Sequence, residues 1–227
     1  MAQAGNRVYR EVSELPERVP VFPLSGALLL PGGQLPLNIF EPRYLEMIDD
    51  AIASDRLIGM IQPSLDGALR ADGEPELCRV GCLGRITSFS ESGDGRYMVA
   101  LHGVTRFRII EEVETRLHYR TCRIKAFAGD LADADVADAV NRDGLLSIFR
   151  RYLAANQLEA DWESVKSAPD DLLVSALCMM MAPQGAAERQ ALLEAEDLKT
   201  RTETLIAITE MALAEDGERD GGPRTLN

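Results

Sequence analysis

The chain has 227 residues, of which 46% are hydrophobic and 27% are charged, and this composition is typical of a folded globular protein. Its formal net charge of −13 argues against duplex nucleic acid and anionic membranes as partners, because both attract clustered Lys and Arg. The charge is uneven, since residues 1–125 carry a net charge of −2 and residues 126–227 a net charge of −11.

The sequence shows no targeting segment. Its first 14 residues lack the apolar core of a secretory signal, and no run approaches the roughly 18–20 apolar residues that a membrane span requires. We therefore expect a cytoplasmic protein that does not bind membranes.

Residues 19–53 contain three short apolar runs, at 19–22, 27–30 and 35–39, which predict three strands. Pro, Gly and Ser separate the runs, and these residues favour turns. Proline at position 42 suits the first turn of a helix, and apolar residues then recur at helical spacing up to Ile52. The order is therefore strand, strand, strand, helix.

The β pattern continues over residues 57–127. A strand at 80–89 and an alternating strand at 96–102 flank the hairpin signal Ser-Gly-Asp-Gly. Gly103 interrupts the pattern before another strand at 104–110, and 117–127 reads as the last strand. Several short strands with regular turn signals favour a small barrel or sandwich.

From about residue 130 the apolar spacing becomes helical. Helices are expected around 145–152, 172–180 and 198–211, with Asp170 capping the second, and Pro183 and Gly185 ending it. We therefore expect an α+β protein. Its parts are a β-rich module at 1–127, a helical bundle at 128–214 and a mobile acidic tail at 215–227.

Several long blocks resemble one known family. They are VPVFPL at 19–24, LPGGQLPLNIFEPRY at 30–44, IGMIQP at 58–63, VGCLGRITSF at 80–89 and RYMVALHGVTRFRI at 96–109. With LLVSAL at 172–177 and RQALLEAEDLKTR at 189–201, they resemble the amino-terminal domain of ATP-dependent Lon proteases, a domain also found alone in many bacterial proteins. The resemblance implies a PUA-like pseudo-barrel followed by a helical bundle, engaged in recognising protein substrates.

The sequence lacks the residue patterns that ATPase and protease catalysis require. None of the three lysines follows a glycine, which excludes a Walker A loop, and there is no Gly-x-Ser-x-Gly elbow. The two histidines, His102 and His118, lie on predicted strands, where catalytic histidines are uncommon. We therefore expect no ATPase or protease activity and no enzyme function.

Metal and cofactor sites are not expected either. The four cysteines are scattered through apolar stretches, where reduced cysteine behaves as a small hydrophobic residue. Cys78 and Cys82 have no second pair and no His-x-x-x-His that would complete four zinc ligands.

Two groups of polar residues are candidates for partner binding. Glu41, Arg43 and Tyr44 match the family block, and Arg43 is expected to pair with a carboxylate at the strand-to-helix junction, with partner contact as the alternative. Arg106 and Arg108 lie two apart on one strand and so share a face. We expect them to form a solvated positive patch, with capture of acidic ligands as the alternative.

Three consecutive methionines end the second predicted helix. Met179, Met180 and Met181 cannot all face one way, because successive helical residues turn by about 100°. At least one should point away from the core unless the helix is wholly buried. Burial in the bundle is the favoured interpretation, and a peptide groove lined by flexible thioethers is the alternative.

The combined interpretation is a non-catalytic protein that binds exposed apolar segments of unfolded polypeptides. The alternatives are a scaffold that docks on a separate protease or ATPase and a barrel that senses a small molecule or nucleic acid. The sequence leaves the oligomeric state open.

Overall fold

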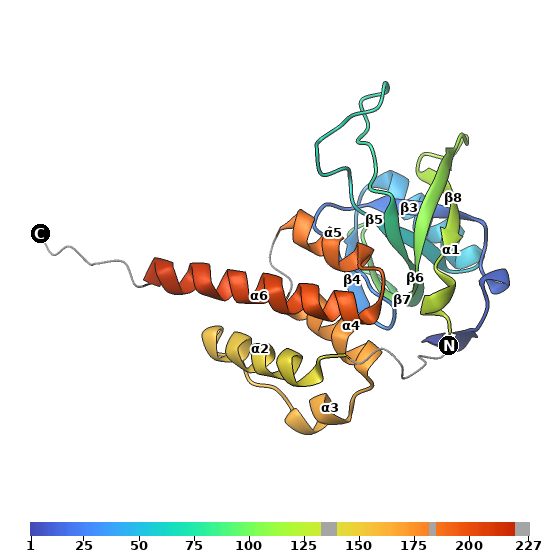
Figure 1. Cartoon of the computed structure of the whole chain (residues 1–227). Coiled ribbons are helices and arrows are strands. Elements are labelled where there is room, and N and C mark those ends of the chain that lie inside the picture. The colour runs from blue at the N-terminus through green and yellow to red at the C-terminus, as the bar shows by residue number, and fades with distance from the viewer. Residues whose placement is uncertain (133–139, 182–184, 221–227) are drawn as a thin grey trace, which may run out of the picture. The chain divides into compact units, whose positions relative to one another are not determined.

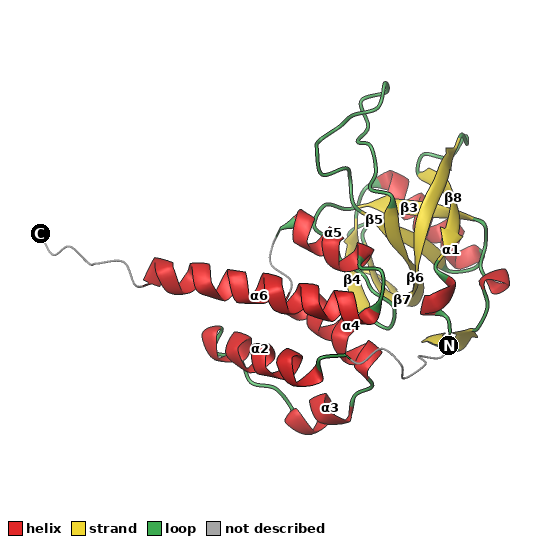
Figure 2. Ribbon diagram, in the orientation of Figure 1, coloured by secondary structure: helices red, strands yellow, loops and turns green. Residues whose placement is uncertain are grey.

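The computed structural model describes residues 1–132, 140–181 and 185–220, with side chains as far as 215. The chain forms two compact units, Met1–Asp135 and Val136–Asn227. The first holds the strands and the second is helical, as Figure 2 shows, so the fold is α+β.

Six strands of the first unit form one sheet in the order β4-β7-β6-β5-β3-β8, and β7 also pairs with β8. This second pairing closes β7, β6, β5, β3 and β8 into a barrel (Figure 1). The strands are β3 (Arg18–Pro23), β4 (Gln34–Ile39), β5 (Leu57–Ile61), β6 (Val80–Glu91), β7 (Tyr97–Val113) and β8 (Arg120–Ala126). A small hairpin, β1 (Ala2–Ala4) and β2 (Arg7–Tyr9), and two 3-10 turns, η1 (Val12–Glu14) and η2 (Ala128–Asp130), complete the unit.

The pairing of β3 with β5 is parallel, whereas the other strand pairs are antiparallel. A parallel pair needs a crossover connection, which is usually helical. Helix α1 (Pro42–Ala53) lies within this connection, after β4.

The predicted order of strands needs one correction. Residues 27–30 form no strand, and they place Leu28, Leu29 and Leu30 in buried positions instead.

Strand β7 is a single strand where the sequence predicted two. Gly103 does not end it; the register against β6 shifts at this point and the strand continues. A Cβ atom at Gly103 would lie 2.0 Å from the carbonyl oxygen of Leu30. Gly103 also accepts a hydrogen bond from the Gly32 amide and donates one to the Gly33 carbonyl, both at 2.9 Å. The glycine therefore permits the close approach of two backbones.

The barrel interior is apolar and centres on Phe107. Cβ atoms added to Gly59 or Gly81 would lie 2.9 and 2.6 Å from its ring, so both glycines leave space for that ring. The other buried members of this core are Ala4, Tyr9, Leu15, Val19, Val21, Leu57, Ile61, Leu83, Val104, Cys122, Ile124 and Leu131.

The second unit contains five helices among its described residues. They are α2 (Arg142–Ala155), α3 (Trp162–Ser167), α4 (Asp170–Met181), α5 (Ala186–Glu194) and α6 (Leu198–Asp220). Helix α6 contacts α2, α4 and α5, and its Leu205 is fully buried.

One prediction for this unit was wrong. Asp170 is the first residue of α4 rather than its cap, and its carboxylate pairs with Arg142. Helix α6 runs to Asp220, so residues 215–220 of the expected mobile tail are helical. Pro183 and residues 221–227 lie outside the described residues. In the described residues, no helix combines the length and the apolar character needed to cross a membrane.

Candidate functional site

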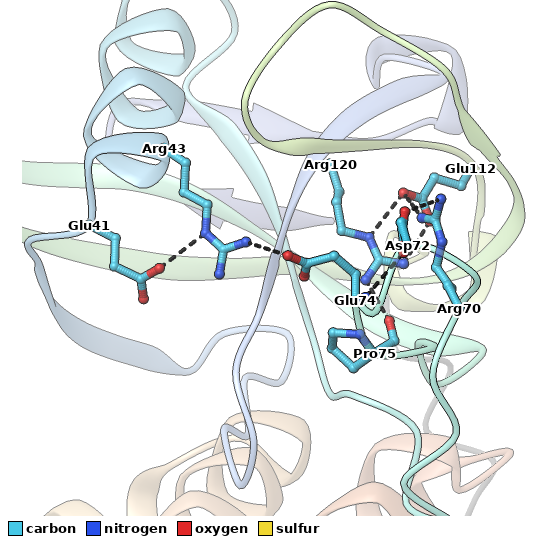
Figure 3. A network of polar contacts seen from close by, with 8 residues as sticks. All are labelled: Glu41, Arg43, Arg70, Asp72, Glu74, Pro75, Glu112 and Arg120. Atoms are coloured by element: carbon cyan, nitrogen blue, oxygen red, sulfur yellow. Dashed lines mark hydrogen bonds and ion pairs between the residues drawn. The ribbon is translucent and has the colours of Figure 1, made fainter.

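The junction between β4 and α1 is held by Arg43. Glu41 has an extended backbone and precedes Pro42 at the first helical position. Arg43 Nε donates to Glu41 Oε2 at 3.0 Å, and Nη1 donates to Glu74 Oε1 at 3.2 Å (Figure 3). The expected pairing of Arg43 with a carboxylate is therefore present, together with a second carboxylate that local sequence did not indicate.

Tyr44 is buried behind this junction. Its ring packs against Phe22 with 4.2 Å between the centroids, and the Arg43 guanidinium lies 4.7 Å from the Tyr44 ring centre. Burial raises the pKa of the Tyr44 hydroxyl above its ordinary value. Tyr44 therefore supports the junction from inside and offers little surface to a partner.

Glu74 belongs to a long connection between β5 and β6, residues 62–79, which we call the 62–79 loop. It projects from the sheet as a long green loop in Figure 2. Its two arms are joined by backbone hydrogen bonds from the Ser64 amide to the Glu76 carbonyl at 2.7 Å and from Cys78 to Gln62 at 2.9 Å. The loop therefore has a defined conformation without being regular secondary structure.

An ion-pair network ties the 62–79 loop to β7 and β8. Arg120 binds Glu112 through two hydrogen bonds, at 3.0 and 2.7 Å, and donates to the Pro75 carbonyl at 2.7 Å. Arg70 donates to the same Glu112 at 2.5 Å, as Figure 3 shows. The Arg120 side chain is only 12% exposed. Bidentate, partly buried pairs of this kind fix geometry as well as adding stability.

The carboxyl group of Glu112 has a perturbed pKa. Burial raises it, but the hydrogen bonds and charges of Arg120 and Arg70 outweigh burial, so the pKa lies below the ordinary 4.5. A carboxylate with a lowered pKa stabilises the folded state above the pKa of the unfolded chain, and this contribution is lost as the pH falls through the folded pKa.

We expect acid to loosen the 62–79 loop. Between pH 6 and pH 3, hydrogen-exchange protection of its amides should fall roughly tenfold, a value reduced for the partial exposure of the network. Glu112→Gln should lower protection already at pH 6 and remove most of this pH dependence. Glu111→Gln, which affects an exposed pair with Arg123, should leave the loop unchanged. An unaltered pH profile in Glu112→Gln would contradict the assignment.

Two leucines of the 62–79 loop face solvent. Leu65 is 50% exposed and Leu69 is 65% exposed, whereas Arg70 and Glu74 of the same loop form ion pairs with Glu112 and Arg43. Sequence reasoning missed these leucines. The available signal was two isolated leucines among turn-forming Pro, Asp and Gly residues, where no strand or helix could bury them.

The two arginines of β7 do not form the expected exposed patch. Arg106 is 4% exposed, and its Nε and Nη2 atoms donate to the Asp130 carboxylate at 3.0 and 2.9 Å. Its guanidinium lies 4.7 Å from the centre of the Phe127 ring. Arg108 is exposed and lies 5.9 Å from the same ring. The prediction was wrong for Arg106 because η2 supplies a carboxylate from 24 residues along the chain.

The three methionines of α4 have different environments. Met181 is 3% exposed, Met179 is half-buried and Met180 is 51% exposed. One methionine therefore points away from the core, and the favoured prediction of full burial was wrong for Met180. Leu172 and Ala176 are also exposed and precede Met180 at four-residue intervals. The three side chains form an apolar stripe along one face of α4.

The environments of three titratable side chains bear on possible chemistry. His118 Nδ1 lies 2.6 Å from Glu46 Oε2, and burial lowers the pKa of the half-buried His102. Burial raises the pKa of the Cys122 thiol to about 12, which disfavours the nucleophilic thiolate. Within the described ranges, no three His, Cys, Asp or Glu side chains are placed to hold a metal ion.

Comparisons with known proteins agree on one domain. The family model of the ATP-dependent protease La (LON) substrate-binding domain matches residues 18–210. Lon protease 2 of Myxococcus xanthus is 26% identical over 206 residues, covering 86% of this chain and 24% of that protein. Lon protease 2 of Sorangium cellulosum is 28% identical over 206 residues, covering 85% of this chain and 24% of the relative. The chain thus spans about a quarter of the length of these curated relatives.

Two solved structures share the fold. The Lon N-terminal domain protein from Xanthomonas campestris has a TM-score of 0.60 at 24% identity, covering 84% of this chain and 97% of that one. The N-terminal domain of the Mycobacterium avium complex Lon protease has a TM-score of 0.62 at 18% identity, covering 85% and 98%. Since the family model covers most of the chain, the protein belongs to the family of Lon substrate-binding domains.

Proposed function

We propose that this protein binds exposed apolar segments of other polypeptides in the cytoplasm and does not cleave them. Membership of the substrate-binding family supports a role in polypeptide recognition. The observation that carries the apolar part of the proposal is the pair Leu65 and Leu69, exposed to solvent on a loop that ion pairs of Arg70 and Glu74 tie to the rest of the barrel unit.

These ion pairs matter because binding orders flexible groups at a cost. A loop that already holds its conformation loses less entropy when a guest binds. Each Å² of apolar surface buried against the guest contributes about 25 cal/mol, so two half-exposed leucines give weak binding. We propose the exposed stripe of α4, with Met180, as a second contact for the same class of guest, because thioether side chains adapt to varied apolar partners.

The charges of the loop favour a particular kind of guest. Asp66, Asp72 and Glu76 are exposed near the two leucines in sequence. Segments that combine apolar residues with Lys or Arg should therefore bind better than acidic ones, and added salt should weaken this preference.

Leu65→Ser/Leu69→Ser is expected to weaken binding of a denatured model protein about tenfold, because two exposed apolar side chains are lost from the contact. The measurement is a titration of immobilised protein with the same model protein in its denatured and native forms. The immobilised wild-type protein should bind the model protein only in its denatured form.

The matched control is Leu117→Ser/Leu158→Ser, which removes two leucines that are 43% and 50% exposed outside the loop. Its affinity should equal that of the wild type. Equal, negligible binding of denatured and native protein would refute the proposed function. Stoichiometric retention of one constant protein from the native lysate, without binding of denatured chains, would favour a scaffold that docks on a separate protease or ATPase.

A further inference from the structure

A small pocket lies beside the end of α1, away from the 62–79 loop in sequence. It has a volume of about 110 Å³ and is lined by Ile52, Arg56, Ile86, Thr87, Ser88 and Phe89. An apolar cavity of about 150 Å³ accommodates a benzene-sized molecule, so this pocket suits one aliphatic side chain. It is much smaller than the roughly 300–1,000 Å³ of sites that hold cofactors or drug-sized ligands.

The pocket borders an unpaired stretch of β6. Only Cys82–Arg85 of this strand pair with β5, and the Ile86 amide then donates to the Arg56 carbonyl at 2.8 Å. Among the described residues, only β7 pairs with residues 88–91 of β6. These residues are exposed, so their outer edge is open to another extended chain.

Most of this edge lacks the sequence features that oppose strand addition. Proteins commonly protect open edges with Pro, Lys or other charged residues. The outer strand β4 follows this rule with Pro36, which has no amide hydrogen to donate. Residues 87–90 of β6, Thr-Ser-Phe-Ser, contain neither a proline nor a charge, whereas Glu91 carries a charge and the register against β7 shifts at Thr87.

Arg56 adds a charge to the pocket. Its side chain is exposed, and its backbone is fixed by a hydrogen bond from its amide to the Ala51 carbonyl at 2.8 Å. In the part of the chain that the structure describes, no carboxylate lies within ion-pair distance of its guanidinium. An extended guest with a carboxylate two residues from its inserted side chain, on the same face, would complement this charge.

We propose that the open edge of β6 at residues 87–91 accepts an extended segment of another polypeptide as an added strand. One leucine-sized side chain of the guest enters the pocket, and an Asp or Glu two residues along the guest, which faces the same side of the added strand, pairs with Arg56. Main-chain hydrogen bonds provide affinity in this mode, and side-chain pockets provide specificity. The inference rests on the proposed polypeptide binding and adds a second, sequence-selective site to it.

The test uses an acetylated and amidated octapeptide of alternating threonine and valine, in which one valine is replaced by leucine and the next valine, two residues along on the same face, is replaced by aspartate. Added to the full, isotope-labelled chain, it should shift the amide resonances of Arg56 and residues 87–91 and slow hydrogen exchange at that edge. Replacing the leucine by serine should weaken binding about tenfold. Methylation of the peptide nitrogens that face β6 should abolish it.

Arg56→Glu should weaken binding of the aspartate peptide and strengthen binding of a lysine version, and this reversal cannot arise from a folding defect. Phe40→Ser, which alters a side chain that is 62% exposed on the β4 to α1 junction, should bind as the wild type does. Equal affinity for the leucine and serine peptides, or resonance shifts confined to other regions, would overturn the inference. If denatured protein still binds in that case, the proposed function survives without this site.

Discussion

Asp130→Ala is expected to destabilise the barrel unit by about 3–5 kcal/mol, because it leaves a buried arginine without its carboxylate. Arg106 and Asp130 side chains are 5% and 9% exposed. Asp130 also accepts a hydrogen bond from the Arg106 backbone amide at 2.8 Å. Unfolding in urea is monitored through hydrogen exchange of the β7 and β8 amides, which reports the stability of the barrel unit directly.

The control for Asp130 is Glu111→Ala. Glu111 also pairs with an arginine of the same unit, but the Arg123 and Glu111 side chains are 42% and 57% exposed. Exposed pairs contribute little, so we expect a change below about 1 kcal/mol. Replacing both Arg106 and Asp130 by apolar residues should recover much of the loss. Equal effects of Asp130→Ala and Glu111→Ala would show that burial of the pair is unimportant.

Arg142→Ala is expected to destabilise the helical unit by about 2–3 kcal/mol. The Arg142 Nη2 group lies 3.0 Å from the carbonyl oxygens of Val165, Lys166 and Ala168, and Nη1 pairs with Asp170. One side chain therefore joins the start of α2 to the end of α3 and the start of α4. We place the expected loss below that of Asp130→Ala because Arg142 is 28% exposed.

The only tryptophan of the chain, Trp162, begins α3, so its fluorescence follows unfolding of the helical unit. Arg151→Ala is the matched control, because Arg151 lies on α2 as Arg142 does. Its pair with Glu210 is at 3.5 Å, and both side chains are more than half exposed. Arg142→Lys should recover only part of the stability, since one ammonium group cannot reproduce the planar fork of donors. A loss in Arg151→Ala as large as in Arg142→Ala would contradict this account.

Local patterns predicted strands and helices well where neighbours in sequence determine them. The alternation in β7 and the helical spacing in α1 each report one buried face. In α6 the spacing predicts the helix but not its buried face, because Met211 is 64% exposed whereas Arg201 and Thr209 are buried. Gly103 shows the limit of this reasoning. A glycine in a strand pattern signals a turn or a close approach, and only the position of Leu30 shows that the second applies.

The candidate site was less predictable because its residues meet across long stretches of chain. Arg43 meets Glu74 31 residues later, and Arg70 meets Glu112 42 residues later. No local period encodes such pairs. The same reason explains the error at Arg106, whose position on a strand indicated exposure until η2 supplied Asp130.

Closure of the barrel joins its first strand to its last, with Val19 opposite Cys122. During synthesis, β3 must therefore wait for about a hundred further residues before this neighbour leaves the ribosome. Contacts of such long sequence separation slow folding and leave strand edges uncovered in the meantime. A nascent copy of this protein is thus itself, for some seconds at ordinary elongation rates, an incomplete chain of the kind that chaperones protect.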